Sequence, residues 1–256
     1  MFGLITGSGF YDIPDLDERA VEPVETPYGA VALTTGRWRG EDVVFLPRHS
    51  ADHSIPPHAI DYRANIWALH RVGARSVLAT AVSGGIDPDL RPGRLVLISD
   101  FLDFTSGRAT TFFDGVTDPG FSHSSGSVTH TDMTTPYDPA MRAVIRRAAE
   151  AESIDLVDGG VYCTTNGPRF ETPAEIEMMR AVGGDLVGMT GYPEVALAAE
   201  AALPYAAIGI ISNPAAGMGA GKLAASDIVA VIEQVADPLY RLIGRVIELS
   251  RVGSTE

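Results

Sequence analysis

The sequence predicts an α/β protein with one mixed, largely parallel sheet flanked by helices. From residue 57 onward, short apolar runs that suit buried strands alternate with longer segments of helical periodicity, which is typical of strand–helix–strand units. No linker rich in Pro or Ser, no internal repeat and no low-complexity block interrupts the 256 residues. We therefore expect a single domain over residues 1–256.

The first part of the chain predicts three strands. Phe2–Thr6 is an apolar run that ends at the glycine turn Gly7-Ser8-Gly9. Val31–Thr35 and Asp42–Pro47 are two further runs, with Arg37–Gly40 as the turn between them.

Helices and strands then alternate. Pro57–Val72 is a predicted helix, because residues 60, 64, 67, 68 and 71 share one face and Gly73 closes it. The other predicted helices are Pro139–Ala151, Pro173–Val182, Glu194–Ala202 and Ser226–Arg251, and the other predicted strands are Ser76–Val82, Arg94–Phe101, Asp158–Thr164, Leu186–Met189 and Tyr205–Ser212. Pro238 should kink or divide the last helix. Residues 105–136, rich in Thr, Ser, Gly and Asp, form a long loop of the kind that is usually functional.

Composition excludes several classes of partner. Lys and Arg total 19 against 33 Asp and Glu, and the resulting net charge of -14 disfavours nucleic acid. A small anionic substrate is still possible, because a local basic group can outweigh the negative charge of the whole protein. No apolar run approaches the ~20 residues of a membrane helix, and the start of the chain lacks the basic region of a signal peptide. The single cysteine, Cys163, excludes an intrachain disulfide, so we expect a buried thiol and a cytoplasmic location.

Polar residues follow most of the predicted strands. They are Ser8, Arg48, His49, the segment Val82–Gly85, Thr190 and Asn213. In open α/β sheets ligands bind at the carboxyl ends of the strands, so these residues should meet at one edge. Arg48 offers a bidentate fork to an oxyanion. With Ser8, Thr190 and the backbone amides near Val82, it predicts a phosphate or sulfate site.

Each segment also has an ordinary structural interpretation. Gly7-Ser8-Gly9 suits a plain turn, and Asp12 replaces the third glycine of a dinucleotide fingerprint. Asn213 suits the start of a turn before Pro214. The spacing of His49, His53 and His58 matches no zinc template, so no metal is expected.

The loop Asn166–Thr172 pairs an aromatic side chain with a carboxylate. Phe170 would stack on a flat heterocycle and Glu171 would accept a ring N–H. Phe170 is equally compatible with a core residue, and Glu171 with an acid favoured by a helix dipole. Thr172 and Pro173 form a natural helix start.

Together these segments resemble the trimeric purine nucleoside phosphorylase and methylthioadenosine phosphorylase family. The resemblance covers nearly the whole chain and rests on Ile5–Gly9, Pro47–Ser50, Asp61–Leu69, Pro92-Gly93, Asn166–Thr172, Gly188–Thr190 and Pro193-Glu194. It implies a mixed sheet of about nine strands, a homotrimer (with a hexamer as the alternative), and no cofactor. It also implies phosphorolysis, in which a nucleoside and phosphate give free purine and a ribose 1-phosphate.

The resemblance implies roles for single residues. Phosphate is bound by Ser8, Arg48, His49, the backbone around Ala81 and Val82, and Thr190. Met189 packs on the ribose, Phe170 stacks on the base, and Asn213 faces the purine N7 and the 6-substituent. The 5′ substituent is read by Ser226 and Val229 of the terminal helix and by His130 from a loop of the neighbouring subunit.

Positions 171, 213 and 215 distinguish the bases that family members accept. Members that take 6-aminopurines carry Ser at the first position and Asp at the other two, whereas this chain has Glu171, Asn213 and Ala215. Asn213 donates to O6, and Glu171 accepts the N1–H of a 6-oxopurine. Adenine has no N1–H and would present a lone pair to Glu171. The predicted substrate is therefore inosine, guanosine or 5′-methylthioinosine.

The 5′ substituent is predicted less directly. Val229 and nearby alanines favour a methylthio group, and residues 213–217 resemble bacterial methylthioinosine phosphorylases. Ser226 also suits a helix N-cap, and the stretch Pro119–Ser127 is longer than the loop of relatives. The alternatives are a methylthioadenosine phosphorylase, a nucleosidase that uses water, and a nucleoside-binding protein without activity.

Overall fold

The structure is a computed structural model that describes residues 1–10, 12–121, 129–219 and 225–252. Its strands are β1 (Phe2–Thr6), β2 (Asp17–Thr26), β3 (Gly29–Trp38), β4 (Glu41–Pro47), β5 (Ser76–Gly85), β6 (Leu95–Leu97), β7 (Asp100–Asp103), β8 (Leu156–Asp158), β9 (Val161–Thr164), β10 (Leu186–Gly188) and β11 (Tyr205–Pro214). Its helices are the 3₁₀ turn η1 (Pro57–Ala59) and α1 (Tyr62–Arg71), α2 (Pro139–Ala151), α3 (Pro173–Ala181), α4 (Gly191–Glu200) and α5 (Ala225–Val252).

Strand β5 is the centre of the sheet. It pairs in parallel with β1 and β11, and its last residues Gly84 and Gly85 pair antiparallel with β10. The pairs β1–β4, β9–β10, β7–β9 and β6–β8 are also parallel, while β2, β3 and β4 form an antiparallel edge. The expected α/β fold with a mixed, largely parallel sheet is confirmed, with eleven strands among the described residues.

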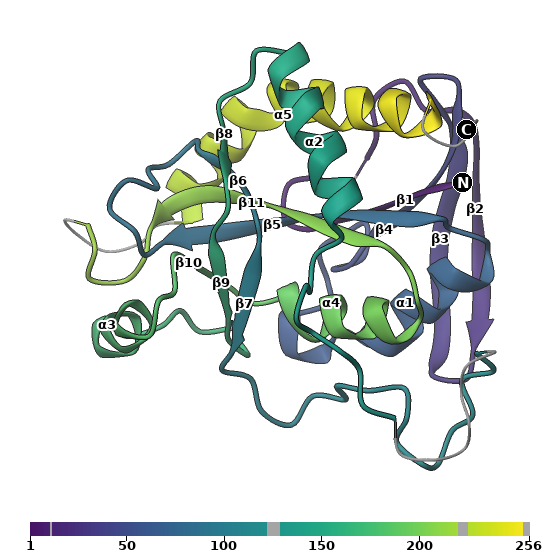
Figure 1. The fold of residues 1–256 in the computed structure, drawn as a ribbon, viewed down its shortest axis with the longest axis horizontal. Helices are drawn as coiled ribbons and strands as arrows, with labels where there is room; N and C mark the ends of the chain where they lie inside the picture. Colours follow the sequence, from purple (N-terminus) through teal and green to yellow (C-terminus); the bar gives the residue numbers. More distant parts are fainter. Residues whose placement is uncertain (11, 122–128, 220–224, 253–256) are drawn as a thin grey trace.

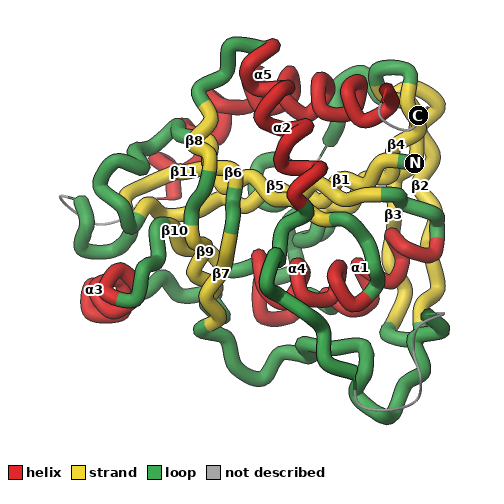
Figure 2. The backbone as a smooth tube through the Cα atoms, in the orientation of Figure 1, coloured by secondary structure: helices red, strands yellow, loops and turns green. Residues whose placement is uncertain are grey.

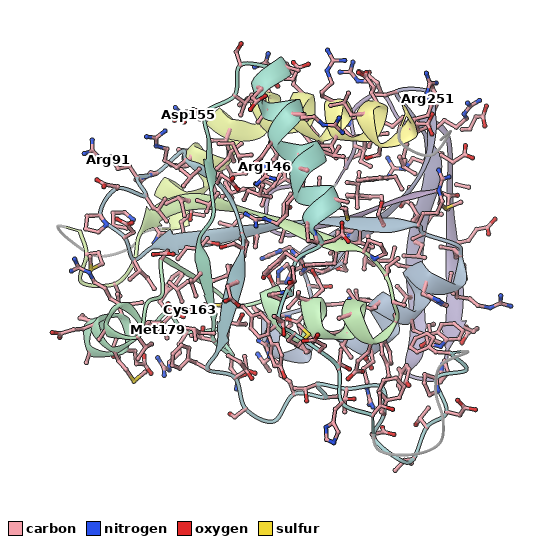
Figure 3. All side chains as sticks on the ribbon, in the orientation of Figure 1. Arg91, Arg146, Asp155, Cys163, Met179 and Arg251 are labelled. Atoms are coloured by element: carbon pink, nitrogen blue, oxygen red, sulfur yellow. The ribbon has the colours of Figure 1, made fainter. Side chains whose placement is uncertain are left out.

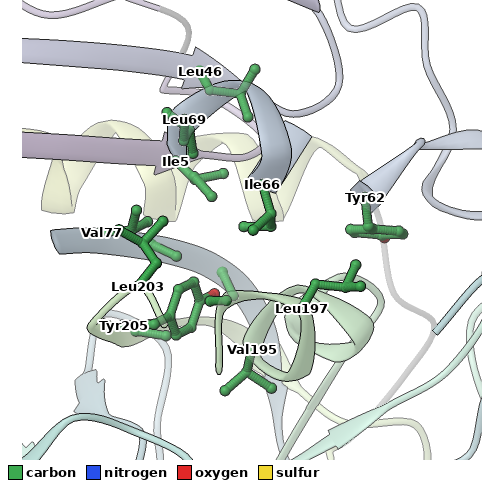
Figure 4. Close-up of a cluster of buried hydrophobic side chains, with 14 of the residues drawn as sticks. Ile5, Leu46, Tyr62, Ile66, Leu69, Val77, Val195, Leu197, Leu203 and Tyr205 are labelled. Atoms are coloured by element: carbon green, nitrogen blue, oxygen red, sulfur yellow. The ribbon is translucent and has the colours of Figure 1, made fainter. Parts of the chain in front are cut away.

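Helices cover both faces of this sheet. In Figure 1, α2 and α5 lie on one face and α1 and α4 on the other. Between α1, α4 and the sheet, Ile66, Leu69, Val195 and Leu197 are fully buried in one core cluster (Figure 4). A second cluster lies under α2 and α5 and includes Ile145, Leu239 and Leu242. Burial of apolar surface on both faces stabilises the sheet that carries the site.

Helix α3 packs on a smaller cluster of its own, which contains Cys163 and Met179 (Figure 3). Burial, reinforced by the charges of Asp185 and Glu171, raises the pKa of the Cys163 thiol to about 12. The thiol therefore stays protonated and unreactive, since the thiolate is the nucleophile.

Two predicted strands are each divided in the structure. Arg94–Phe101 becomes β6 and β7, because β6 pairs with β11 and β8 whereas β7 pairs with β9. Residues 158–164 divide at Gly159, which has φ of 104°, and Gly160, where a Cβ would lie 2.8 Å from Val96 Cγ1. These divisions contribute to the difference between eleven strands and the expected nine or so.

The other differences have local causes. Strand β2 was not predicted, because it is an edge strand with Pro23 and mostly exposed, charged side chains. The β3–β4 turn is only Arg39-Gly40, both at positive φ, so β3 runs on to Trp38. Helix α1 begins after Asp61, whose carboxylate accepts the Ala64 N–H at 3.0 Å.

Helix α5 is not divided at Pro238. One helix spans Ala225–Val252 with this proline inside it. Pro238 removes one backbone hydrogen bond, but Val235 and Leu239 on either side of it are buried in the same cluster. Their packing holds the two halves together, so tertiary contacts outweigh the local preference.

The long loop between β7 and α2 passes along α1 and α4 (Figure 2). Trp67 of α1 donates its indole N–H to Pro119 O at 2.8 Å. Glu200 of α4 accepts from the Phe112 N–H at 2.6 Å and from the Thr111 hydroxyl at 2.7 Å. None of the described helices is long and apolar enough to span a bilayer.

Candidate active site

A cavity of about 410 Å³ opens where several strand ends meet. Ten of the predicted site residues line it: Ser8, Arg48, His49, Val82, Phe170, Glu171, Met189, Thr190, Asn213 and Ala215. They come from six separate segments of the chain. Such a concave, partly apolar site with convergent polar groups is typical of small-molecule binding.

Two arrangements of strands bring these residues together. Strands β1, β4, β5 and β11 are parallel, so the residues that follow them share one edge, as expected. Strand β10 instead runs antiparallel to β5, with Val187 opposite Gly84. Met189 and Thr190 therefore reach the cavity by running back along β5, and not because their strand ends at the same edge.

Arg48 is held by a buried ion pair. Its Nε and Nη2 donate to the two carboxylate oxygens of Glu194 at 3.0 and 2.8 Å, and the two side chains are 1% and 0% exposed. Nη1 donates to Thr80 O at 2.6 Å. Burial by itself would lower the pKa of Arg48, but the Glu194 carboxylate outweighs it and raises that pKa. Tyr205 donates to the same carboxylate at 2.6 Å.

This pairing determines what Arg48 offers to a ligand. Three of its five guanidinium N–H groups are used within the protein. The two that remain belong to Nη1 and Nη2, which form the fork at the end of the side chain. Glu194 balances the charge of the guanidinium, so a bound anion would be recognised mainly by directed hydrogen bonds.

The turn after β1 can contain only glycine at its last position. Gly9 has φ of 84°, and a Cβ there would lie 2.4 Å from Ile232 Cγ2 of α5. At Gly7 a Cβ would lie 3.1 Å from Arg48 Nη1. Ser8 is therefore carried into the cavity on a close-packed backbone that leaves room for Arg48.

His49 lies beside Arg48 in its neutral form. Burial lowers its pKa to about 4, with Arg48 and His53 adding to this effect, although the hydrogen bond to Ile55 O opposes it. Nδ1 lies 2.8 Å from that carbonyl oxygen and carries the proton, since the carbonyl only accepts. Nε2 is then an acceptor in the neutral ring, suited to a protonated ligand oxygen.

The neutral His49 predicts acid sensitivity. The unfolded chain binds a proton near the ordinary pKa of 6.5, whereas the folded chain does so only near pH 4. The stability that depends on neutral His49 is therefore complete above about pH 6.5 and is lost as pH falls towards 4. The loss is at most about 1.4 kcal/mol per pH unit, and less where solvent enters the cavity. The free energy of unfolding, measured with urea at pH 7, 6 and 5, should fall less with decreasing pH in His49→Gln than in the unmodified protein. In His58→Gln, which changes an exposed histidine, it should fall as much as in the unmodified protein.

The loop before α3 brings Phe170 and Glu171 to the cavity. Phe170 is 49% exposed and lines the cavity, so it is not a core residue. The Thr165 hydroxyl donates to Glu171 Oε1 at 2.6 Å and fixes the carboxylate. Arg169 turns away and pairs with Glu175, which forms a capping box with Thr172 at the start of α3.

A β-bulge orients Asn213. The register of β11 against β5 shifts between Ile211 and Asn213, so that Ser212 and Asn213 both line the cavity although they are consecutive. The Ser212 hydroxyl donates to Asn213 Oδ1 at 2.7 Å, and Asn213 Nδ2 donates to Pro214 O at 2.8 Å. One amide N–H and part of the acceptor capacity of Oδ1 stay available to a ligand.

Three predicted residues, Ala81, Val229 and His130, are not part of this lining, and a fourth, Ser226, falls outside the described side chains. Ala81 is buried in the core, and its carbonyl accepts from Ser83, so the segment that faces the cavity is Val82–Gly84. Val229 is exposed and its neighbour Ile228 lines the cavity instead. His130 is exposed elsewhere on the chain. The side chain of Ser226 lies outside the described residues, as does the part of the stretch 119–127 from residue 122 onward.

The segment from His53 to Pro57 also lines the cavity and was not assigned to it from the sequence. Ile55 is 37% exposed there, and the His49 and His53 rings lie 4.9 Å apart. No strand or spacing signal marks this segment, since it reaches the cavity through a loop. The described residues contain no group of three or more His, Cys, Asp or Glu suited to a metal ion.

The sequence profile of the phosphorylase superfamily matches residues 1–248. The chain belongs to this superfamily. It is 47% identical over 240 residues to a probable 6-oxopurine nucleoside phosphorylase of Moorella thermoacetica, covering 94% of this chain and 89% of the relative. It is 42% identical over 247 residues to a probable S-methyl-5′-thioinosine phosphorylase of Methanopyrus kandleri, with 96% and 91% covered.

Solved structures of the superfamily have the same architecture. The methylthioadenosine phosphorylase of Schistosoma mansoni in complex with adenine is 32% identical and superimposes with a TM-score of 0.88. The comparison covers 100% of this chain and 92% of that one. The predicted family resemblance and the nucleoside phosphorylase fold are thereby confirmed.

Proposed function

We propose that the chain catalyses phosphorolysis of a 6-oxopurine nucleoside. The substrate is inosine, guanosine or 5′-methylthioinosine, and the products are the free purine and ribose 1-phosphate or its 5-methylthio analogue. The observation that carries this proposal is that one cavity is lined by the fixed guanidinium of Arg48, which can bind an anion, and by Glu171 and Asn213, which can bind a base. The relatives named above support the same activity.

Phosphate is the second substrate in this proposal. The lining of the cavity includes Ser8, Arg48, Thr190 and the segment Val82–Gly84. In this proposal, phosphate accepts from the free N–H groups of Arg48, from the two hydroxyls and from amides of that segment. Thr190 precedes α4 without a side-chain capping bond, and its side chain forms a hydrogen bond with Tyr162 instead. A nucleosidase, which activates water, has no use for so many anion donors.

The base is recognised by groups that match a 6-oxopurine. Thr165 occupies one oxygen of Glu171, so the carboxylate presents the other to the N1–H of hypoxanthine or guanine. The free N–H of Asn213 donates to O6, and the half-exposed ring of Phe170 stacks on the base. Adenine would place a lone pair against the carboxylate.

The mechanism follows from these positions. The bond between the sugar C1′ and the purine N9 lengthens first, which leaves positive charge on the ribose and negative charge on the departing base. Hydrogen bonds from Asn213 to the base strengthen as this charge develops, so they stabilise the transition state more than the ground state. An oxygen of hydrogen phosphate then forms the bond to C1′, and the proton that phosphate gives up passes to the purine anion, so that neutral purine and ribose 1-phosphate leave. Met189 packs against the ribose. Its side chain also packs against Gly167, where a Cβ would lie only 2.4 Å from the Met189 sulfur.

We also propose a homotrimer, with a hexamer as the alternative, and action in the cytoplasm. The support for assembly is that the cavity has apolar residues Ile55 and Ile228 on its rim while His130 is exposed away from it. In this arrangement His130 reads the 5′ group of a neighbouring subunit. Val229, exposed beside Ile228, fits the same interface, and Ser226 is assigned to it by position alone.

The function is tested by incubating the protein with inosine, methylthioinosine, adenosine and methylthioadenosine, each with and without phosphate. Phosphate-dependent release of hypoxanthine is expected, and the faster of the first two substrates identifies the 5′ group. Release of adenine instead would contradict the base assignment. Release without phosphate would indicate a nucleosidase, and binding without release would indicate a protein that only binds nucleosides.

A further inference from the structure

Arg108 does not line the cavity but donates hydrogen bonds to two segments that carry lining residues. It lies in the long loop after β7 and is half-buried. Its Nη2 donates to Met189 O at 2.8 Å, to Thr165 O at 3.1 Å and to Asn166 O at 3.2 Å, and its Nη1 donates to Tyr192 O. All four acceptors are main-chain carbonyl oxygens, so the guanidinium binds the backbone of two segments, residues 165–166 and residues 189–192, rather than one side chain.

These four carbonyls belong to the segments that carry the site. Thr165 orients Glu171 through its hydroxyl, and Asn166 opens the loop that carries Phe170. Met189 and Tyr192 lie on either side of Thr190 in the chain, and Met189 and Thr190 line the cavity. The Met189 carbonyl and the Thr190 N–H belong to one planar peptide group, so a hydrogen bond that fixes the first also orients the second.

Tyr62 supports Arg108 from the opposite side. The guanidinium carbon lies 5.2 Å from the centre of the Tyr62 ring, within cation–π distance. The Tyr62 hydroxyl lies 3.1 Å from Pro57 O, on the cavity rim, and 3.4 Å from Met189 O. The Met189 carbonyl is thus held by two side chains that reach it from different elements.

We propose that Arg108 is a positioning residue that sets the spacing between the base-binding loop, residues 165–171, and the segment 189–192. This proposal rests on the function assigned to the cavity above. The β9–β10 pairing and the hydrogen bond from the Thr165 N–H to Gly188 O, at 2.9 Å, join the two segments at their start. Arg108 supplies a common donor to carbonyls beyond this point, so its removal lets the segment 189–192 shift against the loop. Because reacting groups must be held closely, a shift of about 1 Å between base and phosphate is expected to lower the rate about 100-fold.

The structure offers a matched control in Arg63. Its guanidinium carbon also lies over a tyrosine ring, 4.5 Å from the centre of Tyr28, and it pairs with Asp114 of the same long loop at 2.7 Å. Arg63 does not line the cavity or contact the segments above. Arg63→Ala therefore loosens the same loop without separating the two parts of the site.

The test compares Arg108→Ala, Arg108→Lys and Arg63→Ala with the unmodified protein, each assayed about 10 °C below its own Tm. For Arg108→Ala, kcat/KM for the best 6-oxopurine nucleoside should fall about 100-fold, and millimolar guanidinium ion should restore part of it. Arg108→Lys should recover little, because one ammonium group cannot replace a planar fork. The kcat/KM of Arg63→Ala should stay within about twofold of the value for the unmodified protein, and added guanidinium ion should not change it.

Calorimetric binding of hypoxanthine and of inorganic phosphate supplies a readout that does not need turnover. Arg108→Ala should weaken both ligands, because both parts of the site lose their common support. Unchanged affinities and kcat/KM for Arg108→Ala, or equal losses in Arg63→Ala, would overturn the positioning role. An unmodified protein that releases no base would instead contradict the proposed function, and the two binding measurements would still decide the role of Arg108.

Discussion

Asn213→Asp should lower kcat/KM for 6-oxopurine nucleosides by about 100-fold or more and raise it for 6-aminopurine nucleosides. The amide N–H that donates to O6 is lost, and an ionised carboxylate would face O6 with like charge. A 6-amino group would instead donate to that carboxylate. The effect is large because the side chain is nearly buried and its partners cannot rearrange freely.

The surroundings of Asn213 make the exchange specific. Asn213 Nδ2 donates to Pro214 O at 2.8 Å, and an aspartate oxygen there would be repelled by the carbonyl, so the new carboxylate must turn or bind a proton. The Ser212 hydroxyl remains a donor on the other side. We expect the full gain on 6-aminopurines only when Glu171→Ser is added, since Glu171 otherwise still meets the adenine N1 lone pair.

Steady-state kinetics with methylthioinosine and methylthioadenosine measures this exchange. The KM for phosphate is the internal control and should stay within about threefold, because the proposed phosphate donors lie on other strand ends. If the ratio of the two kcat/KM values does not move in either variant, position 213 has no part in choosing the base.

Glu194→Gln should destabilise the protein strongly, because it leaves the Arg48 cation buried without its counter-charge. Removing one partner of a buried ion pair typically costs about 3–5 kcal/mol. For a chain of this size, each kcal/mol corresponds to roughly 2–4 °C in Tm, so a loss of about 10 °C is expected. Inorganic phosphate should raise the Tm of this variant more than that of the unmodified protein, since the anion replaces the missing charge.

Two further variants separate charge from packing. Arg48→Met combined with Glu194→Leu should recover most of the lost stability, because a hydrophobic pair can replace a buried ion pair, but it should have no phosphorolytic activity. Glu175→Gln alters a bidentate pair of similar geometry at the surface, between Arg169 and Glu175, and should shift Tm far less. A double variant as unstable as Glu194→Gln would show that the ion-pair argument is wrong.

The sequence predicted most strands and helices because their local signals agree with the fold. Residues 139–151 have an N-cap, a proline at the first position and an apolar face, and the helix forms there as predicted. Divided strands and the edge strand β2 were missed for the opposite reason. Where such a strand begins and ends depends on which strand pairs with it. The chain ends β6, which pairs with β8, and then forms β7, which pairs with β9.

Ten residues that line the cavity were likewise predicted to meet there, since each follows a strand or lies in a recognisable loop. Ile55, Ile228 and Arg108 were not, because each reaches the site through a loop or a helix whose position relative to the sheet has no local signal. Glu194 was noticed as part of a motif, but its ion pair with Arg48 spans 146 residues and exists only in the folded chain.

What the sequence by itself determined is the chemistry available at each strand end: an arginine fork, a carboxylate beside an aromatic ring, and an amide in place of an acid. Only the tertiary structure decided how these groups act. The bulge at Ser212 orients Asn213, Glu194 and the Thr80 carbonyl together leave Arg48 two free N–H groups, and Arg108 joins two segments through their carbonyls. Local sequence encodes donors and acceptors, whereas their direction depends on partners distant in the chain, which only packing brings within hydrogen-bonding distance.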